Sequence, residues 1–178
     1  KSLGNIINVL LQISKIEAGQ EISKNLIRID DVIFDCISEI NSLHPDFNFE
    51  VNFTPSNFNE NTLTIQANEP LIKQAFLNLL INAVHYSDNQ KAKITFDCNS
   101  DNLKISISNP GKTLLDEEQK FLFSHFFRGK NAKNQQGFGL GLVLSQRIFS
   151  IHNASINYRL ENSENVFVVD WGIGGLGN

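Results

Sequence analysis

Apolar side chains recur every three or four residues in five stretches of the chain, a period that predicts amphipathic helices. The expected helices span residues 2–18, 30–43, 69–86, 116–127 and 140–149. Gly19 suits the end of the first helix, and Asp30 or Asp31 suits the start of the second. Pro70 suits the first turn of the third helix, which we expect at the centre of the fold.

Other stretches alternate between apolar and polar residues, which is typical of strands with one buried face. The expected strands span residues 21–29, 48–53, 63–67, 91–98, 103–108, 154–160 and 166–171. Short polar turns at 99–102 and 161–165 join the last four strands in pairs, and this indicates antiparallel or mixed pairing. The pattern favours an α+β fold over a doubly wound sheet: a two-layer sandwich whose mixed, mostly antiparallel sheet packs on helices.

The helix over residues 2–18 stands apart from this pattern. It has too few neighbours in the sequence to bury its apolar stripe, so we expect the end of a longer helix from a bundle or coiled coil. The chain lacks methionine and begins within the helical pattern, so we expect a fragment of a longer protein. We divide it into a helix end (1–19), a main domain (20–172) and a glycine-rich tail (173–178).

Charge and composition exclude some classes of function. The 178 residues carry a formal net charge of −4 at pH 7, which argues against nucleic acid as a partner. Cys36 and Cys98 are far apart and outside any CxxC motif, and this suggests two reduced thiols in the core of a cytoplasmic protein. No apolar run reaches the roughly 18 residues of a membrane span, so we expect no membrane contact by this fragment.

Asn78 and Asn82 lie four residues apart, and therefore on one face, of the helix predicted over 69–86. Asparagine is a poor helix former, so two asparagines in mid-helix call for an explanation. One explanation is an exposed polar face. The other is that their amide oxygens face a hard cation such as Mg²⁺, which takes oxygen ligands and usually shares them with nucleotide phosphates.

Three later segments also carry candidate chemistry. Asn109-Pro110-Gly111 ends a strand, where a side-chain amide could meet the edge of an adenine. Leu122–Gly129 combines aromatic residues with Arg128, whose guanidinium can pair with phosphate. Alternating glycines over residues 137–141 precede a helix, which is typical either of a plain turn or of a turn whose N–H groups approach an anion.

In this order the segments resemble the ATP-binding catalytic domain of the sensor histidine kinases of two-component systems, within the GHKL group that includes gyrase-type and Hsp90-type ATPases. The matching segments are Asn78–Ser87, Asn109–Gly111, Leu122–Gly129 and Gly137–Leu142. In addition, Leu10–Gly19 resembles the end of the second dimerisation helix of these kinases, which separates them from the other ATPases of the group. The resemblance covers nearly the whole chain. It implies the Bergerat ATP-binding fold, with ATP and Mg²⁺ as cofactors.

The resemblance also implies a role for each matching residue. Asn82 would coordinate Mg²⁺, with Asn78 beside it, bridging to the triphosphate. Asn109 would accept a hydrogen bond from the adenine amino group, and Gly111 would let the backbone pass close to the base. A mobile lid over residues 129–136 would close on the nucleotide. The other ATP-binding residues that the resemblance implies are His85, Tyr86, Arg128, Gly137, Gly139, Leu140, Gly141 and Leu142.

Two positions depart from the family's pattern. Asn109 stands where the family usually has Asp, so the bond to the base lacks a charge and is expected to be weaker. His85 stands where many members have Lys, and the charge of an imidazole depends on pH. These departures leave open a degenerate module that binds partners without turnover. Another GHKL activity, such as that of an anti-sigma serine kinase, is a further alternative.

The phosphoacceptor of this family is a histidine followed directly by an acidic residue. None of the four histidines here has such a neighbour, and His44, His125 and His152 are expected to be structural or exposed. We therefore expect a protein-histidine kinase domain without a catalytic residue of its own, which transfers the γ-phosphate of ATP to an upstream dimerisation helix. The implied partners are that helical domain and a response regulator, in a homodimeric full-length protein. The fragment is expected in the cytoplasm, whether or not the full-length protein is anchored in a membrane.

Overall fold

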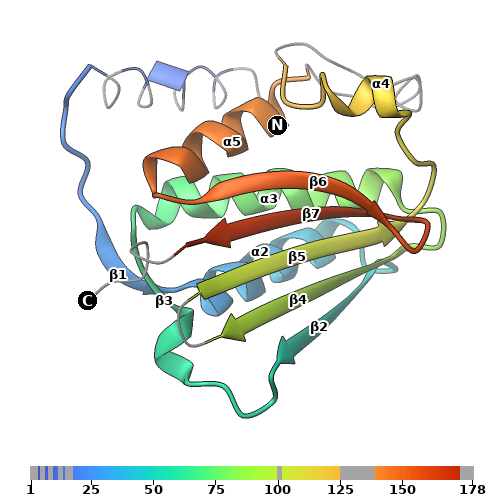
Figure 1. Ribbon diagram of the computed structural model, residues 1–178, viewed down its shortest axis with the longest axis horizontal. Helices are drawn as coiled ribbons and strands as arrows, with labels where there is room; N and C mark the ends of the chain where they lie inside the picture. The colour runs from blue at the N-terminus through green and yellow to red at the C-terminus, as the bar shows by residue number, and fades with distance from the viewer. Residues whose placement is uncertain are drawn as a thin grey trace.

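The computed structural model describes residues 4, 7, 10–11, 14, 18–99, 102–124 and 139–172 (Figure 1). The tail over 173–178, the predicted lid and most of the predicted helix over 2–18 therefore lie outside the described residues. The N–H of Ala18 donates to the carbonyl of Ser14 at 3.0 Å, and Gly19 follows with a φ of +91°. A glycine in this left-handed conformation ends a helical turn there, as the sequence predicts.

A five-stranded mixed sheet forms one layer of the molecule. Its strands, in spatial order, are β2 (Asn48–Thr54), β4 (Lys91–Asn99), β5 (Asn102–Pro110), β7 (Glu164–Trp171) and β6 (Ser155–Glu161). Only β2 and β4 among these neighbours run parallel; the other pairs are antiparallel. A smaller antiparallel pair joins β1 (Asn25–Arg28) to β3 (Thr64–Ala67). The mixed, mostly antiparallel sheet predicted from the sequence is confirmed.

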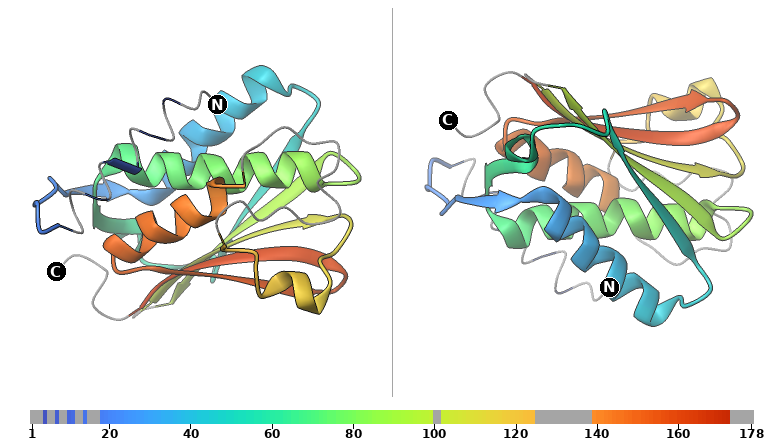
Figure 2. Two further views of the ribbon diagram at one scale, coloured as in Figure 1. Left: turned by 90° about the horizontal axis from the view of Figure 1, so that it is seen from above. Right: turned by 90° about the horizontal axis from the view of Figure 1, so that it is seen from below.

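Three helices form the second layer. Figure 2 shows α2 (Ile29–Leu43), α3 (Glu69–Tyr86) and α5 (Gly141–Ile151) together on one face of the five-stranded sheet. Two further short elements are the 3₁₀ helix η1 (Glu60–Leu63) and the helix α4 (Asp116–Gln119). The α+β two-layer sandwich is therefore confirmed. None of the described helices is both long enough and apolar enough to cross a membrane.

The core lies between the two layers, and alternation along the strands places it there. On β5, Leu103, Ile105 and Ile107 point toward the helices and are buried, while the residues between them are partly exposed. Phe76 of α3 and Phe149 of α5 meet Trp171 of β7, with ring centroids 5.2–6.3 Å apart. This aromatic cluster fixes both helices against the sheet.

Both cysteines are buried thiols outside any disulfide, as expected. Cys36 lies on the inner face of α2, where its Sγ approaches the carbonyl of Lys73 at 3.7 Å. Burial, with a smaller effect of nearby carboxylates, raises the pKa of the Cys98 thiol to about 11. Both are therefore inert core residues under ordinary conditions.

The start of α2 corrects the sequence-based expectation. The helix begins at Ile29, and neither Asp30 nor Asp31 is its N-cap; that position belongs to Arg28, without a side-chain cap. The buried Asp30 instead forms an ion pair with Arg28 at 2.7 Å. A charge partner from the preceding strand β1, itself shorter than predicted, thus replaces the cap.

The helix expected over 116–127 is also wrong in extent. Of residues 116–124, which the structure describes, Asp116–Gln119 is helical and turns continue to Ser124. In these turns N–H groups bond to carbonyls three residues back, at 3.1 Å for Phe121 and 3.2 Å for Leu122. In this winding Leu122 is buried and Phe121 is about half exposed.

Candidate functional site

One stripe of α3 connects two glycine-containing segments that are far apart in sequence. Asn78, Asn82 and Tyr86 follow each other at one-turn spacing, about 6 Å per step along the helix axis. The Asn78 amide contacts Gly141 at the start of α5, and the Tyr86 carbonyl lies beside Gly111 at the end of β5. The partly buried Asn82 therefore lies between the two segments, as the sequence-based hypothesis requires.

Asn78 is buried between α3 and α5. Its Nδ2 donates to the carbonyl of Gly141 at 3.1 Å and to the hydroxyl of Ser145 at 3.2 Å. Its Oδ1 accepts from Nε2 of Gln74 at 3.2 Å. The residue is 7% exposed, in contrast to the more accessible Asn82. The structure thus gives the two asparagines different surroundings, although the sequence assigns them to one cluster.

Asn109 lies near the C-terminal end of β5, on the face that is turned toward the helices. It continues the buried side of that strand, so its carboxamide points toward the helices, and the residue is 3% exposed. Its Nδ2 donates to the carbonyl of Pro110 at 3.3 Å. A polar group enclosed between the two layers needs a hydrogen-bond partner. The carboxamide of Asn109 is therefore suited to recognise the polar edge of a ligand.

Gly111, two residues after Asn109, packs against the last turn of α3. A Cβ at this position would overlap the carbonyl oxygen of Tyr86, and φ is +157°. The nearby N–H of Asp88 donates to the carbonyl of Pro110 at 3.1 Å, which holds the two segments together. The requirement for glycine at this position thus arises from contact with α3, a reason that the sequence does not reveal.

Asn165 is a candidate site residue that the sequence analysis placed in a turn. The turn between β6 and β7 is shorter than predicted, so Asn165 belongs to β7, directly opposite Asn109 in the strand register. It is 6% exposed. Its Oδ1 accepts from the Tyr158 hydroxyl at 2.7 Å, and its Nδ2 has no hydrogen-bond partner among the described residues. The alternation of Phe167 and Trp171 on the same strand is the signal that locates it on the inner face.

His85 lies in the last turn of α3, next to Tyr86. Burial lowers the pKa of its imidazole below the ordinary value of 6.5, and the nearby His44 lowers it further. The ring is therefore mostly neutral at pH 7 in this structure. A lysine at the same position would carry a full charge at that pH. The departure from the family's pattern therefore removes most of a positive charge from this position.

The start of α5 presents backbone N–H groups. Gly139 has a φ of +66°, Leu140 is the N-cap, and the first closing hydrogen bond runs from Leu144 N–H to the Leu140 carbonyl at 3.0 Å. The amides of Gly141 and Leu142 come before that bond, so the helix itself offers them no acceptor. Such a turn can hold an anion. Arg128 and Gly137 lie outside the described residues.

Among the described residues, no three His, Cys, Asp or Glu side chains gather where they could hold a metal ion. A cation at this site would therefore depend on amide oxygens and on oxygens of its ligand.

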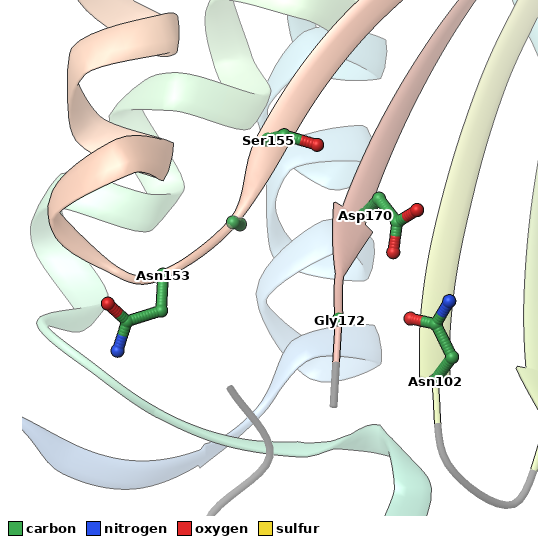
Figure 3. A pocket seen from close by; sticks show the side chains of 6 residues that line it. Asn102, Asn153, Ser155, Asp170 and Gly172 are labelled. Atoms are coloured by element: carbon green, nitrogen blue, oxygen red, sulfur yellow. The ribbon is translucent and has the colours of Figure 1, made fainter. Parts of the chain in front are cut away.

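A separate depression lies at the other end of the sheet. It has a volume of about 580 Å³ and is lined by Asn102, Asn153, Ala154, Ser155, Asp170 and Gly172 (Figure 3). Asn102 and Asn109 lie at opposite ends of β5, about 23 Å apart at the usual rise per residue. Lys104 pairs with Asp170 at 3.4 Å and balances its charge. This depression is therefore distinct from the candidate site.

The geometry can now be compared with known proteins. Residues 67–171, which run from the end of β3 through β7, match the family of histidine kinase-, DNA gyrase B- and HSP90-like ATPases. The chain belongs to this family. The match contains every described segment that the resemblance had singled out on α3, β5 and α5, and it supports the interpretation of the chain as the ATP-binding catalytic domain of histidine kinases.

Individual relatives agree with this membership. The signal transduction histidine-protein kinase ArlS of Staphylococcus aureus is 29% identical over 160 residues, which are 88% of this chain and 34% of ArlS. The chain thus spans about a third of the length of this curated relative. The histidine kinase AdeS of Acinetobacter baumannii has a similar structure, with a TM-score of 0.72 at 20% identity, over 97% of this chain and 79% of AdeS.

A third comparison extends the structural agreement. Full-length ShkA in complex with AMPPNP has a TM-score of 0.71 at 18% identity, over 95% of this chain and 35% of ShkA. At this identity the likeness shows the fold. The sandwich described above is therefore that of histidine kinase catalytic domains.

Proposed function

We propose that this chain binds Mg–ATP along the stripe of α3 and donates the γ-phosphate to a histidine on a dimerisation helix. The observation that carries the proposal is the position of Asn82, one helical turn from the contact with Gly141 and one turn from the contact with Gly111. The amide oxygen of Asn82 would then coordinate a metal ion that is also bound by the phosphates of the nucleotide.

The base end of the site fits a purine. Asn109 supplies an acceptor for an exocyclic amino group, and the residue is enclosed enough for that bond to be selective. Asn165, opposite it in the register, supplies a buried donor that no described residue accepts from, and a ring nitrogen of the base would satisfy it. Two facing carboxamides at one strand end therefore support recognition of a flat, polar heterocycle.

The phosphate end fits the start of α5. The N–H groups of Gly141 and Leu142 point out of the first turn, and the helix dipole favours negative charge there. Asn82 is the metal ligand in this proposal, and Arg128 and the glycines of the turn complete the phosphate contacts. Bound Mg²⁺ would neutralise charge on the phosphates during transfer.

The partners follow from the same proposal. A histidine followed by an acidic residue on a dimerisation helix would accept the phosphate, and a response regulator would take it further. The chain itself contributes binding, orientation and charge stabilisation, because none of its four histidines precedes an acidic residue. The full-length protein would act as a homodimer with this domain in the cytoplasm.

Calorimetric titration with ATP, with and without Mg²⁺, tests the proposal. We expect micromolar-range binding of Mg–ATP by the wild type, and Asn82→Ala should lose the part of the affinity that depends on Mg²⁺. Asn41→Ala, at an exposed asparagine of α2, is the matched control and should bind as the wild type does. Absence of nucleotide binding by the wild type would overturn the proposal, and an unchanged Mg²⁺ dependence in Asn82→Ala would overturn the metal assignment.

A degenerate module remains the second candidate, since Asn109 and His85 both replace charged groups of the family's pattern. A phosphotransfer assay on the full-length protein separates the two. Acid-labile phosphate on a histidine supports the kinase, and nucleotide binding without such a product supports the degenerate module.

A further inference from the structure

We propose that the depression at the far end of the sheet binds a guanidinium group between Asn102 and Asp170. This site goes beyond the proposed function, because it lies about 23 Å along β5 from Asn109. The observation that carries the proposal is a pair of enclosed side-chain oxygens. Both belong to residues that line one depression, and neither accepts a hydrogen bond from a described residue.

Three neighbouring strands bring the polar groups of this site together on the face of the sheet that is turned away from the helices. Asp170 of β7 lies directly opposite Ser155 of β6 and Lys104 of β5 in the strand register. Asn102 lies two residues before Lys104, and therefore on the same face of β5. Figure 3 shows Asp170 and Asn102 converging from neighbouring strands, whereas Asn153 points away from both.

The two oxygens call for hydrogen-bond donors. Oδ1 of Asp170 and Oδ1 of Asn102 are enclosed, and no described residue donates to either. Oδ2 of Asp170, by contrast, pairs with Lys104 at 3.4 Å. An enclosed acceptor without a donor is costly, and more so when it carries charge. The site therefore favours a ligand with at least two donor groups.

Charge selects a cationic donor over a neutral one. Lys104 balances the formal charge of Asp170, but its side chain is 43% exposed, and exposed ion pairs contribute little. A charged donor bonds to a carboxylate more strongly than a neutral donor does. A guanidinium adds a rigid fork of parallel N–H groups, which reaches two oxygens at once. The pair formed by Asn102 and Asp170 offers two such oxygens.

A metal ion fits the site less well. It would need several oxygen ligands, and the ammonium beside Asp170 repels a doubly charged ion more strongly than a singly charged one. The depression has a volume of about 580 Å³, which has room for a guanidinium together with its alkyl chain. The ligand is therefore an arginine-like group, carried either by a small molecule or by the surface of a partner protein.

Titration with ethylguanidinium, followed by NMR at the Asn102 carboxamide and the Ser155 backbone amide, tests the proposal. We expect saturable shifts with a dissociation constant of about 1–10 mM, since so small a probe makes few contacts. Ethylurea has a similar shape without the charge and should bind at least about tenfold more weakly. The measurement needs no nucleotide, so its outcome is independent of the proposed function.

Substitutions locate the bound probe. Asp170→Asn keeps the shape of the side chain and removes its charge, so ethylguanidinium should bind at least about tenfold more weakly. Asn102→Asp adds a second carboxylate and should tighten binding about three- to tenfold. This gain keeps the test decisive if Asp170→Asn fails to fold, because misfolding does not create affinity. Asp31→Asn, at an exposed carboxylate of α2, is the matched control and should bind as the wild type does.

Three results would overturn the proposal. Absence of saturable shifts below about 20 mM would mean that solvent, or a flipped Asn102 amide that donates to Asp170, satisfies these oxygens. Unchanged affinity in Asp170→Asn, or equal affinity for ethylurea, would exclude a charge-assisted contact. The same shifts produced by MgCl₂ alone would assign the site to a metal ion.

Two further probes distinguish the sources of the guanidinium. N-acetylarginine methylamide resembles an arginine within a protein chain, and tighter binding of this probe would indicate a partner protein. Tighter binding of free arginine would indicate a small-molecule ligand. Failure of both to bind would contradict an arginine-like ligand.

Discussion

The backbone N–H of Asn68 donates to Nε2 of the buried His152 at 3.0 Å. The other ring nitrogen, Nδ1, lies 2.6 Å from the carbonyl of Ile148, so Nδ1 carries the proton and the imidazole is neutral. Asn68 also caps α3 through the Leu71 N–H, and its Nδ2 donates to the carbonyl of Ser23. One histidine thus fastens the start of α3 to the end of α5, opposite the candidate site.

Stability should fall in mild acid because of this contact. Burial lowers the pKa of His152 below 6.5; the bond to Ile148 opposes this effect and Lys24 adds to it. The unfolded chain then binds a proton at a higher pH than the folded chain does. The contribution of His152 is therefore present above pH 6.5 and is lost as the pH falls below that value. Urea unfolding at pH 7.5 and 5.5 measures the loss.

The comparison variant is His152→Gln, whose side chain can accept from Asn68 and does not titrate. It should lose less stability than the wild type between the two pH values. Part of the pH dependence should persist in the variant, because the pKa of His85 is also lowered by burial. Equal losses in the wild type and in His152→Gln would contradict the assignment.

The sequence predicts most of the architecture because local patterns carry it. The start of α3 follows from Pro70 in its first turn, and the alternation along β4 and β5 predicts both strands within two residues at each end. What the sequence misses depends on distant partners. At the start of α2, Asp30 pairs with Arg28 and caps no helix, and α4 is only four residues long although its apolar spacing continues further.

The candidate site divides in the same way. The glycines, asparagines and the departure at His85 are visible as motifs. The partner of Asn78, however, lies 63 residues away, and only the folded chain shows that its amide is committed to α5. The sequence did not identify Asn165, because the turn between β6 and β7 was predicted to be five residues long and is two residues long. The longer predicted turn included Asn165, which belongs to β7.

Gly139, just before α5, and Gly141, its first residue, should respond differently to alanine. At Gly141 an added Cβ would lie 3.6 Å from Cγ of Asn78, an ordinary contact, so Gly141→Ala should leave the free energy of unfolding unchanged or raise it by about 0.5–1 kcal/mol. At Gly139 φ is +66°, so Gly139→Ala should cost about 1 kcal/mol. Urea unfolding of both variants checks this.

Nucleotide titration of the same pair then isolates the role of Gly141. If its backbone must approach a phosphate, Gly141→Ala should lose about tenfold in ATP affinity while it stays folded. If Gly141→Ala bound ATP as tightly as the wild type, Gly141 would be only the first residue of the helix, without a phosphate contact.

The charge at position 85 should control the pH dependence of nucleotide affinity. His85 is mostly neutral at pH 7 because burial lowers its pKa, so it gains a charge only as the pH falls below about 6.5. Affinity in the wild type should be flat from pH 8 to 7 and should rise toward pH 6. His85→Lys should bind about two- to fivefold more tightly at pH 7.5 and show little change, since one added ion pair contributes up to about 1 kcal/mol. A rise of the same size in His85→Gln would show that another group titrates.

The contact between Gly111 and Tyr86 should make Gly111→Ala the most destabilising of the glycine substitutions discussed. A Cβ at this position would overlap the Tyr86 carbonyl, so the end of β5 and the last turn of α3 would have to separate. Overpacking of this kind costs about 1–3 kcal/mol, which urea unfolding measures directly. Gly172→Ala is the matched control, because among the described residues no atom other than those of its chain neighbours lies within 4 Å of its added Cβ. Its stability should stay within about 0.5 kcal/mol of the wild type. Since the separation would also displace Asn109 from Asn82, Gly111→Ala should lose ATP affinity with and without Mg²⁺. An unchanged unfolding midpoint would show that the end of β5 can move away from α3 without a loss of stability. The structural reason for glycine at this position would then be refuted.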